Sequence, residues 1–141
     1  MSFMASIALQ GAVYERLRDD PAVAALVGDA VYDAMPVSPP SGTHVSLGPE
    51  VVRDAGDMTA AGSEHDFTVS VLSGADQDNG GFGGVKAAAA AVAAALEGGE
   101  ALALSRGRLA GLWFLRANAR RTENGAGRRV DLTFRARVDL G

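Results

Sequence analysis

The residues with the clearest potential for chemistry are two histidines and the acidic residues beside them. His65 lies between Glu64 and Asp66, and His44 lies on an earlier apolar stretch. If the two strands pair in register, the imidazoles and carboxylates could form a zinc-type metal site. Neighbouring side chains on a strand point to opposite faces, however, so His65 and its flanking acids do not converge. The pattern favours two ordinary histidines within a sheet.

Other motifs for catalysis or phosphate binding are incomplete. Ser63, Ser70 and Ser73 lie outside the glycine-flanked turn that exposes a nucleophilic serine, and no adjacent motif supplies a base. The glycine-rich residues 80–84 precede an expected helix, whose free backbone donors could meet a phosphate. Lys86 is followed by alanine, however, where a Walker loop has serine or threonine. We therefore predict no catalytic residue, no metal and no cofactor.

Length and composition predict one soluble domain. The chain has 141 residues, 48% of them apolar, and no cysteine, which excludes disulfides and thiolate chemistry. One packed core fits this length, so we predict a single domain over residues 1–141. The start lacks the form of a secretory signal, and the longest apolar run, residues 87–96, is about half the length of a membrane helix. We expect a protein assembled in the bacterial cytoplasm, without membrane contact.

Charge is distributed unevenly along the chain. Residues 1–100 carry four basic and fourteen acidic side chains, whereas residues 101–141 carry nine arginines and three acidic side chains. The two parts have net charges of −10 and +6, which add to the total of −4. Such asymmetry can indicate a face for nucleic acid, a surface that meets the acidic part of a neighbouring copy, or a solvated sheet face. A net acidic chain with one lysine argues against general nucleic-acid binding.

The strongest structural pattern stands at the end of the chain. Apolar and polar residues alternate from Val130 to Leu140, which predicts a strand with one covered and one charged face. The stretch 108–122 has large side chains on both faces, so we predict a central strand that is covered on both sides. Further strands are predicted at residues 30–35, 43–47 and 64–73.

Apolar residues at helical spacing predict two longer helices, over residues 5–17 and 85–96. Asp20 as N-cap and Pro21 at the first helical position predict a short helix over residues 21–27. Turn and end signals stand at Gly28, at Gly98 and Gly99, and at residues 124–127. The fold class predicted is α/β of the α+β type: a single mixed, largely antiparallel sheet of about five strands with helices packed on one face.

Two stretches lack clear periodicity and are predicted to be loops. Residues 48–63 are too long for a simple connector, and loops of that length are commonly functional or disordered. In the alternative interpretation, the preceding strand continues through Val51, Val52 and Arg53 and forms a long hairpin arm. Residues 74–84 are acidic and rich in glycine. Under either interpretation we expect the 48–63 segment to contact a partner.

Arginines concentrate on two strands that are expected to pair. Arg116, Arg120 and Arg121 belong to the first of them, and Arg129, Arg135 and Arg137 share the polar face of the second with Asp131. An uncompensated positive face costs self-repulsion, so we predict that either DNA or acidic groups of an adjacent subunit or partner, such as Asp54, Asp57, Asp76 and Asp78, neutralise it. We favour protein, because the first hundred residues carry the matching negative excess. The residues assigned to subunit or partner contacts are Val51, Val52, Arg53, Asp54, Asp57, Asp76, Asp78, Arg116, Arg120, Arg121, Arg129, Arg135 and Arg137.

Several segments, in order and spacing, resemble the tail-completion or tail-terminator family of long-tailed phages and phage-like gene transfer agents. The resemblance covers most of the chain. The matching segments are Leu17-Arg18-Asp19-Asp20-Pro21-Ala22-Val23, residues 27–36, His44-Val45-Ser46-Leu47-Gly48, residues 62–73 and the helix 85–96. The composition, heavy in alanine and arginine, departs from the family pattern and leaves open whether the particle is a phage or a gene transfer agent.

The resemblance implies a small α/β domain that forms a hexameric ring on the end of a tail tube. Such a ring stops tube growth and joins the tail to the head. The implied partners are other copies of the chain, the tail tube protein and a head-tail connector or stopper, with DNA passing through the lumen without specific binding. No enzyme activity and no cofactor are implied. The alternatives are a head-side connector or stopper protein, and a small ligand- or metal-binding domain using His44 and His65.

Overall fold

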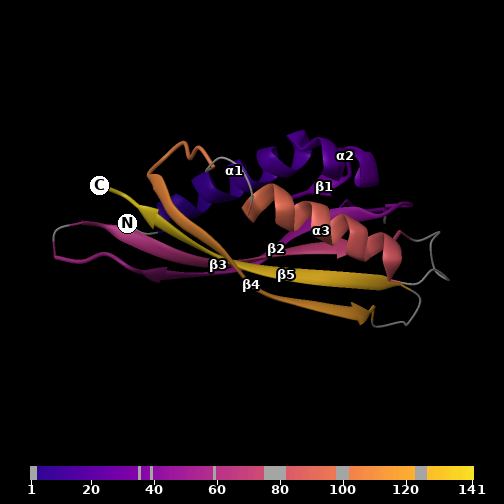
Figure 1. Ribbon diagram of the computed structural model, residues 1–141. Coiled ribbons are helices and arrows are strands. Elements are labelled where there is room, and N and C mark those ends of the chain that lie inside the picture. Colours follow the sequence, from indigo (N-terminus) through magenta and orange to yellow (C-terminus); the bar gives the residue numbers. More distant parts are fainter. Residues whose placement is uncertain are drawn as a thin grey trace.

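A single sheet with helices on one face is the framework of the molecule, as Figure 1 shows for the computed structural model. The structure describes residues 3–34, 36–38, 40–58, 60–74, 82–97, 102–122 and 127–141. Within them the elements are α1 (Met4–Asp19), α2 (Pro21–Val27), β1 (Val31–Tyr32), β2 (His44–Asp54), β3 (Gly62–Leu72), α3 (Gly83–Glu97), β4 (Arg108–Arg121) and β5 (Arg128–Asp139). The predicted fold class is confirmed.

The strand order of the sheet is β1-β2-β3-β5-β4. Only β1 and β2 pair in parallel, and the other neighbours are antiparallel. The final strand of the chain, β5, therefore lies inside the sheet, whereas β4 lies at its edge. The prediction that residues 108–122 form a central, covered strand is wrong. β4 has large apolar side chains on both faces, but part of this apolar surface is exposed to solvent instead of being covered.

The core lies between β5, β3 and the helices. Val130, Leu132, Phe134, Ala136 and Val138 are all buried, which confirms the alternation predicted for the final strand. The Phe134 ring lies at the centre of this layer, with its centroid 5.7 Å from that of a stacked ring on β3 and 5.7 Å from that of an edge-on ring on β4. Burial of aromatic surface of this kind is a main source of folding free energy.

Local signals set the helix ends as predicted. The Asp20 carboxylate accepts a hydrogen bond from the backbone N–H of Val23 at 3.1 Å and so caps α2, with Pro21 as its first residue. Gly28 ends this helix at a φ of 65°, where its N–H donates to the carbonyl of Ala24 at 2.8 Å. A left-handed backbone of this kind favours glycine. The signals predicted at residues 98–99 and 124–126 lie outside the described residues.

The segment between the first two long strands differs from the main prediction. β2 continues to Asp54 and β3 begins at Gly62. The prediction of a loop over residues 48–63 is therefore wrong, and the alternative prediction of a hairpin arm is confirmed. In Figure 1 this arm extends beyond the helices. A bulge between Leu47 and Glu50 breaks the alternation of β2, which explains why the sequence lacks a clear period there.

The strand predicted at residues 30–35 is shorter in the structure. Only Val31 and Tyr32 pair with β2, and Met35 lies outside the described residues. Most of the acidic segment 74–84 also lies outside them. Among the described residues, no helix is long and apolar enough to cross a membrane.

Candidate functional site

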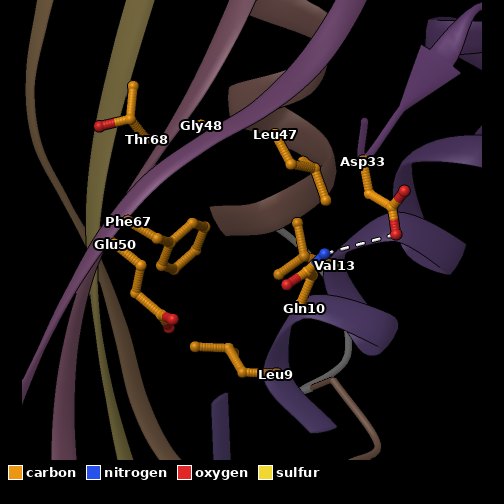
Figure 2. Close-up of a pocket in the computed structure, with 9 residues that line it drawn as sticks. All are labelled: Leu9, Gln10, Val13, Asp33, Leu47, Gly48, Glu50, Phe67 and Thr68. Atoms are coloured by element: carbon orange, nitrogen blue, oxygen red, sulfur yellow. Dashed lines mark hydrogen bonds between the residues drawn. The ribbon is translucent and has the colours of Figure 1, made fainter. Parts of the chain in front are cut away.

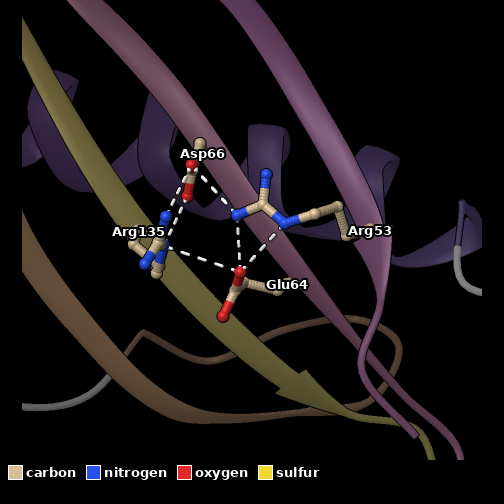
Figure 3. A network of polar contacts seen from close by, with 4 residues as sticks. All are labelled: Arg53, Glu64, Asp66 and Arg135. Carbon is tan, nitrogen blue, oxygen red and sulfur yellow. Dashed lines mark hydrogen bonds and ion pairs between the residues drawn. The ribbon is translucent and has the colours of Figure 1, made fainter.

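The sheet face opposite the helices, here called the outer face, carries a network of charged side chains (Figure 3). Arg135 on β5 donates two hydrogen bonds to Asp66 on β3, from Nε at 2.8 Å and from Nη2 at 3.0 Å. Arg53 on β2 donates through Nη2 to Asp66 at 3.1 Å and through Nε to Glu64 at 3.1 Å. Three strands are therefore joined across their outer face by alternating charges.

This network fixes the ionisation of its members. The hydrogen bonds from Arg135, followed by those from Arg53, lower the pKa of Asp66 from 3.8 to about 2. The same contacts raise the pKa of both arginines above the usual value, with the hydrogen bond to Asp66 as the main cause for Arg135 and the hydrogen bond to Glu64 for Arg53. Hydrogen bonding to the charged form of a group favours that form.

A second cluster surrounds Asp131 on the outer face of β5. Arg129 donates to its carboxylate at 2.8 Å, the Ser70 hydroxyl donates at 2.6 Å, and Arg120 of β4 forms an ion pair at 3.4 Å. Burial acts to raise the pKa of Asp131, but the hydrogen bonds from Arg129 and Ser70 outweigh it and the pKa is lowered. Arg137 donates to the carbonyl of Ala55 at 2.7 Å and holds the hairpin arm.

These contacts correct the prediction of an uncompensated positive face. The charges of Arg129 and Arg135 are paired within the chain itself. In contrast, Arg116 and Arg121 on β4 form no ion pair with any described residue. Among the described residues, positive charge without an ion-pair partner therefore lies at Arg116 and Arg121 on the edge strand and at Arg137 on β5, which donates to a neutral carbonyl.

A buried line of polar side chains crosses the helix side of the hairpin arm. Ser63 and His65 of β3 are fully buried, and the Ser63 hydroxyl lies 2.7 Å from His65 Nε2. His65 Nδ1 lies 2.9 Å from Glu50 of β2, and Ser6 of α1 donates a hydrogen bond to the same carboxylate. Because an ionised carboxylate only accepts, His65 donates from Nδ1 to Glu50, and the Ser63 hydroxyl is hydrogen-bonded to the other ring nitrogen, Nε2.

The order of these groups, serine, imidazole and carboxylate, is that of a catalytic triad. The sequence has no nucleophile-elbow motif around Ser63, but the structure places an imidazole beside its hydroxyl. Both Ser63 and His65 are inaccessible to a substrate, at 0% exposure, so the line holds α1 against β2 and β3 instead. Burial acts to raise the pKa of Glu50, but the hydrogen bonds from His65 and Ser6 outweigh it, and the net shift is downward.

The register of the sheet keeps the two histidines apart. His44 pairs with Leu72 at one end of β2, whereas His65 pairs with Val52, eight residues further along. The same span on β3 is the seven residues from Leu72 to His65, and at about 3.4 Å per residue it separates the histidines by about 24 Å. His44 Nδ1 lies 2.9 Å from the carbonyl of Gly42. The metal site that would use both histidines is therefore not formed, and no group of three potential metal ligands occurs among the described residues.

A small cavity lies between α1 and the bulge of β2 (Figure 2). Its volume is about 150 Å³. Gln10 and Asp33 meet at its rim through a hydrogen bond of 3.3 Å, and the Glu50 carboxylate at the other side is already bonded to Ser6 and His65. Ligand and cofactor pockets are usually larger than about 300 Å³, so we assign this cavity to packing around the bulge.

The edge strand β4 presents an apolar surface that the sequence pattern placed in the core. Trp113 is 50% exposed, Phe114 41% and Leu115 36%. The indole of Trp113 lies so close to Gly111 that a Cβ atom at this position would collide with the ring. One side of the β4 backbone faces no other described strand. Exposed edges that combine apolar side chains with unpaired backbone groups are typical contact sites for another chain.

The opposite edge of the sheet has its own exposed apolar group. On the side away from β3, β1 covers only Val45 and Ser46 of β2, so the rest of β2 faces no other described strand on that side. The N-terminal turn of α1 lies above this part of β2, held by the bond from Ser6 to Glu50. The exposed apolar residues of this turn are Phe3, Met4 and Ile7.

The predicted contact residues lie on several separate elements. Val51, Val52, Arg53 and Asp54 belong to the β2 arm, and Asp57 to its tip; Arg116, Arg120 and Arg121 belong to β4; Arg129, Arg135 and Arg137 belong to β5. Asp76 and Asp78 lie outside the described residues. The sequence reasoning missed Trp113, Phe114 and Leu115 as surface residues, because an apolar run has the same pattern at an edge as at a centre. Ser63 and His65 are two positions apart, so their side chains lie on the same face of a strand, and this spacing was the sequence signal for the buried line.

Comparisons with known proteins agree in pointing to one class. Residues 11–139 match the family model described as tail completion protein gp17. A solved structure titled "Virion of native gene transfer agent (GTA) particle" contains a chain that is 59% identical, with a TM-score of 0.88, and the match covers 98% of this chain and 99% of that one. No match was found among curated proteins.

Proposed function

The chain belongs to the tail completion protein gp17 family, and on that premise we propose that it is a tail terminator of a phage-like particle. In this role it forms a ring, with six copies expected, on the end of the tail tube. The ring stops tube polymerisation and joins the tail to the head connector. It is a structural protein, and DNA passes through its lumen without specific binding.

The observation that supports this proposal most directly is the free β4 edge. A monomeric protein usually covers, shortens or charges its edge strands, because exposed apolar edges associate. Here a strand of 14 residues exposes three consecutive large apolar residues, Trp113, Phe114 and Leu115. Such a surface suits a subunit that is buried in an assembly. The match to a chain of a gene transfer agent virion over nearly its whole length supports the same conclusion.

The possible sites inside the molecule do not support an enzymatic function to the same degree. The serine and imidazole of the triad-like line are buried, and the cavity beside Glu50 is small. A ligand-binding domain using both histidines would need them together, which the strand register prevents. The assembly role is therefore the one that the surface and the family favour together.

The test is to polymerise the purified tail tube protein with and without this chain. We expect tubes of shorter and more uniform length when the chain is present, with rings on one end by electron microscopy. Addition after polymerisation should cap existing tubes. Unchanged tube lengths and no ring on any tube would refute the terminator role. Binding to the head connector alone, with no tube contact, would support the alternative of a head-side connector or stopper.

A further inference from the structure

We propose that neighbouring copies join head to tail, with the β4 edge of one copy packed against the α1 N-terminus and the β1–β2 edge of the next. The inference rests on the proposed ring and names the surfaces that build it. Here the β4 surface means Trp113, Leu115, Arg116 and Arg121, and the α1 surface means Met4, Ile7, Asp29 and Asp33. The strands that these two surfaces include or adjoin, β4 for the first and β1 with β2 for the second, lie at opposite edges of the same sheet.

The apolar parts of the two surfaces complement each other. On the first, Trp113 and Leu115 are exposed; on the second, Met4 is 47% exposed and Ile7 77%. Ile7 points away from the core, because the buried residues of that turn, Ala5, Ser6, Ala8 and Leu9, lie on the opposite side of the helix. Burial of such side chains in a contact removes apolar area from water on both copies.

The charges on the two surfaces are opposite. Arg116 and Arg121 have no ion-pair partner among the described residues. Asp29 and Asp33 are exposed and flank β1, the other edge strand. Contact between these edges brings cations to anions, whereas contact between two β4 edges would bring arginines of both copies together. Like charges opposite each other on paired strands are destabilising.

This preference decides the symmetry of the contact. An interface between two different surfaces of one chain is heterologous, and such interfaces close into rings when the rotation between copies permits it. β2 and β4 run antiparallel within the sheet, because each step from β2 to β3, β5 and β4 reverses direction. Copies that share one orientation around a ring therefore place β4 antiparallel to the β2 of the next copy. The bulge and Pro49 interrupt that edge of β2, so we expect side-chain packing rather than a continuous ladder.

The decisive experiment uses two variants, each blocked at one edge. The first carries Trp113→Glu and Leu115→Glu, and the second carries Met4→Arg and Ile7→Arg. Each variant alone should remain monomeric by sedimentation velocity under conditions in which the unaltered chain assembles. An equal mixture should form complexes with both variants in a 1:1 ratio by native mass spectrometry, since each supplies the edge that the other lacks. Leu26→Glu, on exposed α2, is the matched control and should assemble normally.

The outcomes separate this inference from the proposed function. Self-association of the second variant alone would show a contact between two β4 edges and overturn the inference. Normal rings from both variants would also overturn it, while the terminator role would stand. Failure of the unaltered chain to form any ring, even on tail tubes, would overturn both. Circular dichroism of each variant confirms folding before mixing.

A charge exchange provides a second arm that does not alter the apolar groups. Arg116→Glu with Arg121→Glu should weaken association about tenfold or more, as should Asp29→Lys with Asp33→Lys. A chain that carries all four substitutions should recover association, because opposite charges again face each other across the contact. If the fourfold variant associates more weakly than either double variant, the assigned pairing of the two edges is contradicted.

Discussion

Replacement of Asp66 by asparagine tests whether the charged outer face stabilises the fold. Asp66 accepts hydrogen bonds from Arg135 and Arg53, and its pKa is lowered from 3.8 to about 2. At about 1.4 kcal/mol for each pKa unit, this shift corresponds to about 2.5 kcal/mol. The side chains of Arg53 and Arg135 are 44% and 37% exposed, so solvent screening reduces the effect. We expect Asp66→Asn to lower the free energy of unfolding by about 1 to 2 kcal/mol at neutral pH.

The pH dependence of this effect has a definite sign. The pKa of Asp66 is lower in the folded chain than in the unfolded chain, so the ionised carboxylate favours folding. Its contribution is complete above the unfolded value of 3.8, declines as the pH falls, and disappears below the folded value of about 2. The difference between wild type and Asp66→Asn should follow the same course and vanish in strong acid.

Chemical denaturation of the isolated subunit from pH 7 to pH 2 measures this difference directly. The matched control is Asp139→Asn on the neighbouring strand, whose carboxylate pairs with Arg108 at 2.6 Å. The Arg108 side chain is 73% exposed, so this control should change the free energy of unfolding by less than about 1 kcal/mol. A difference for Asp66→Asn that stays constant down to pH 2 would refute the electrostatic reasoning. So would an effect no larger than that of the control.

Three further predictions address the buried line, the core and the edge. Glu50→Ala leaves the buried His65 Nδ1 without its acceptor and should lower the free energy of unfolding by about 1 to 3 kcal/mol, measured by thermal or chemical unfolding. The substitution should not change the hydrolysis rate of a test ester above the rate without protein. Phe134→Ala removes a fully buried ring and should cost about 3 to 5 kcal/mol by the same measurement, while Phe134→Leu should cost less. Arg116→Gln with Arg121→Gln should change stability by less than about 0.5 kcal/mol, yet should weaken ring assembly in a salt-dependent way that sedimentation detects.

Features set by local sequence were predictable. The alternation from Val130 to Val138 determines which face of β5 is buried, whatever its neighbours are. Asp20, Pro21 and Gly28 likewise act within one turn of α2, through a capping carboxylate, a missing N–H and a left-handed backbone. Such signals depend on residues a few positions away, so one sequence suffices to interpret them.

Features set by pairing between distant strands were not predictable. Whether β4 lies at the centre or the edge depends on the position of β5, which inserts between β3 and β4. An apolar run such as 112–115 gives no local indication of that order. The bulge at Gly48 and Pro49 shifts the phase of β2, so Glu50 turns toward His65 on the helix side instead of the outer face.

The sheet order also explains what becomes of the uneven charge of the chain. β3 belongs to the acidic first part and β5 to the basic last part, and they are neighbours, so Asp66 and Arg135 neutralise each other across one ladder. Charged side chains that are not paired in this way lie at both edges of the sheet. β1, flanked by Asp29 and Asp33, forms one edge, and β4, with Arg116 and Arg121, forms the other. A separation of charge along the sequence thereby becomes a separation across the molecule, and that polarity is what a head-to-tail contact between identical copies requires.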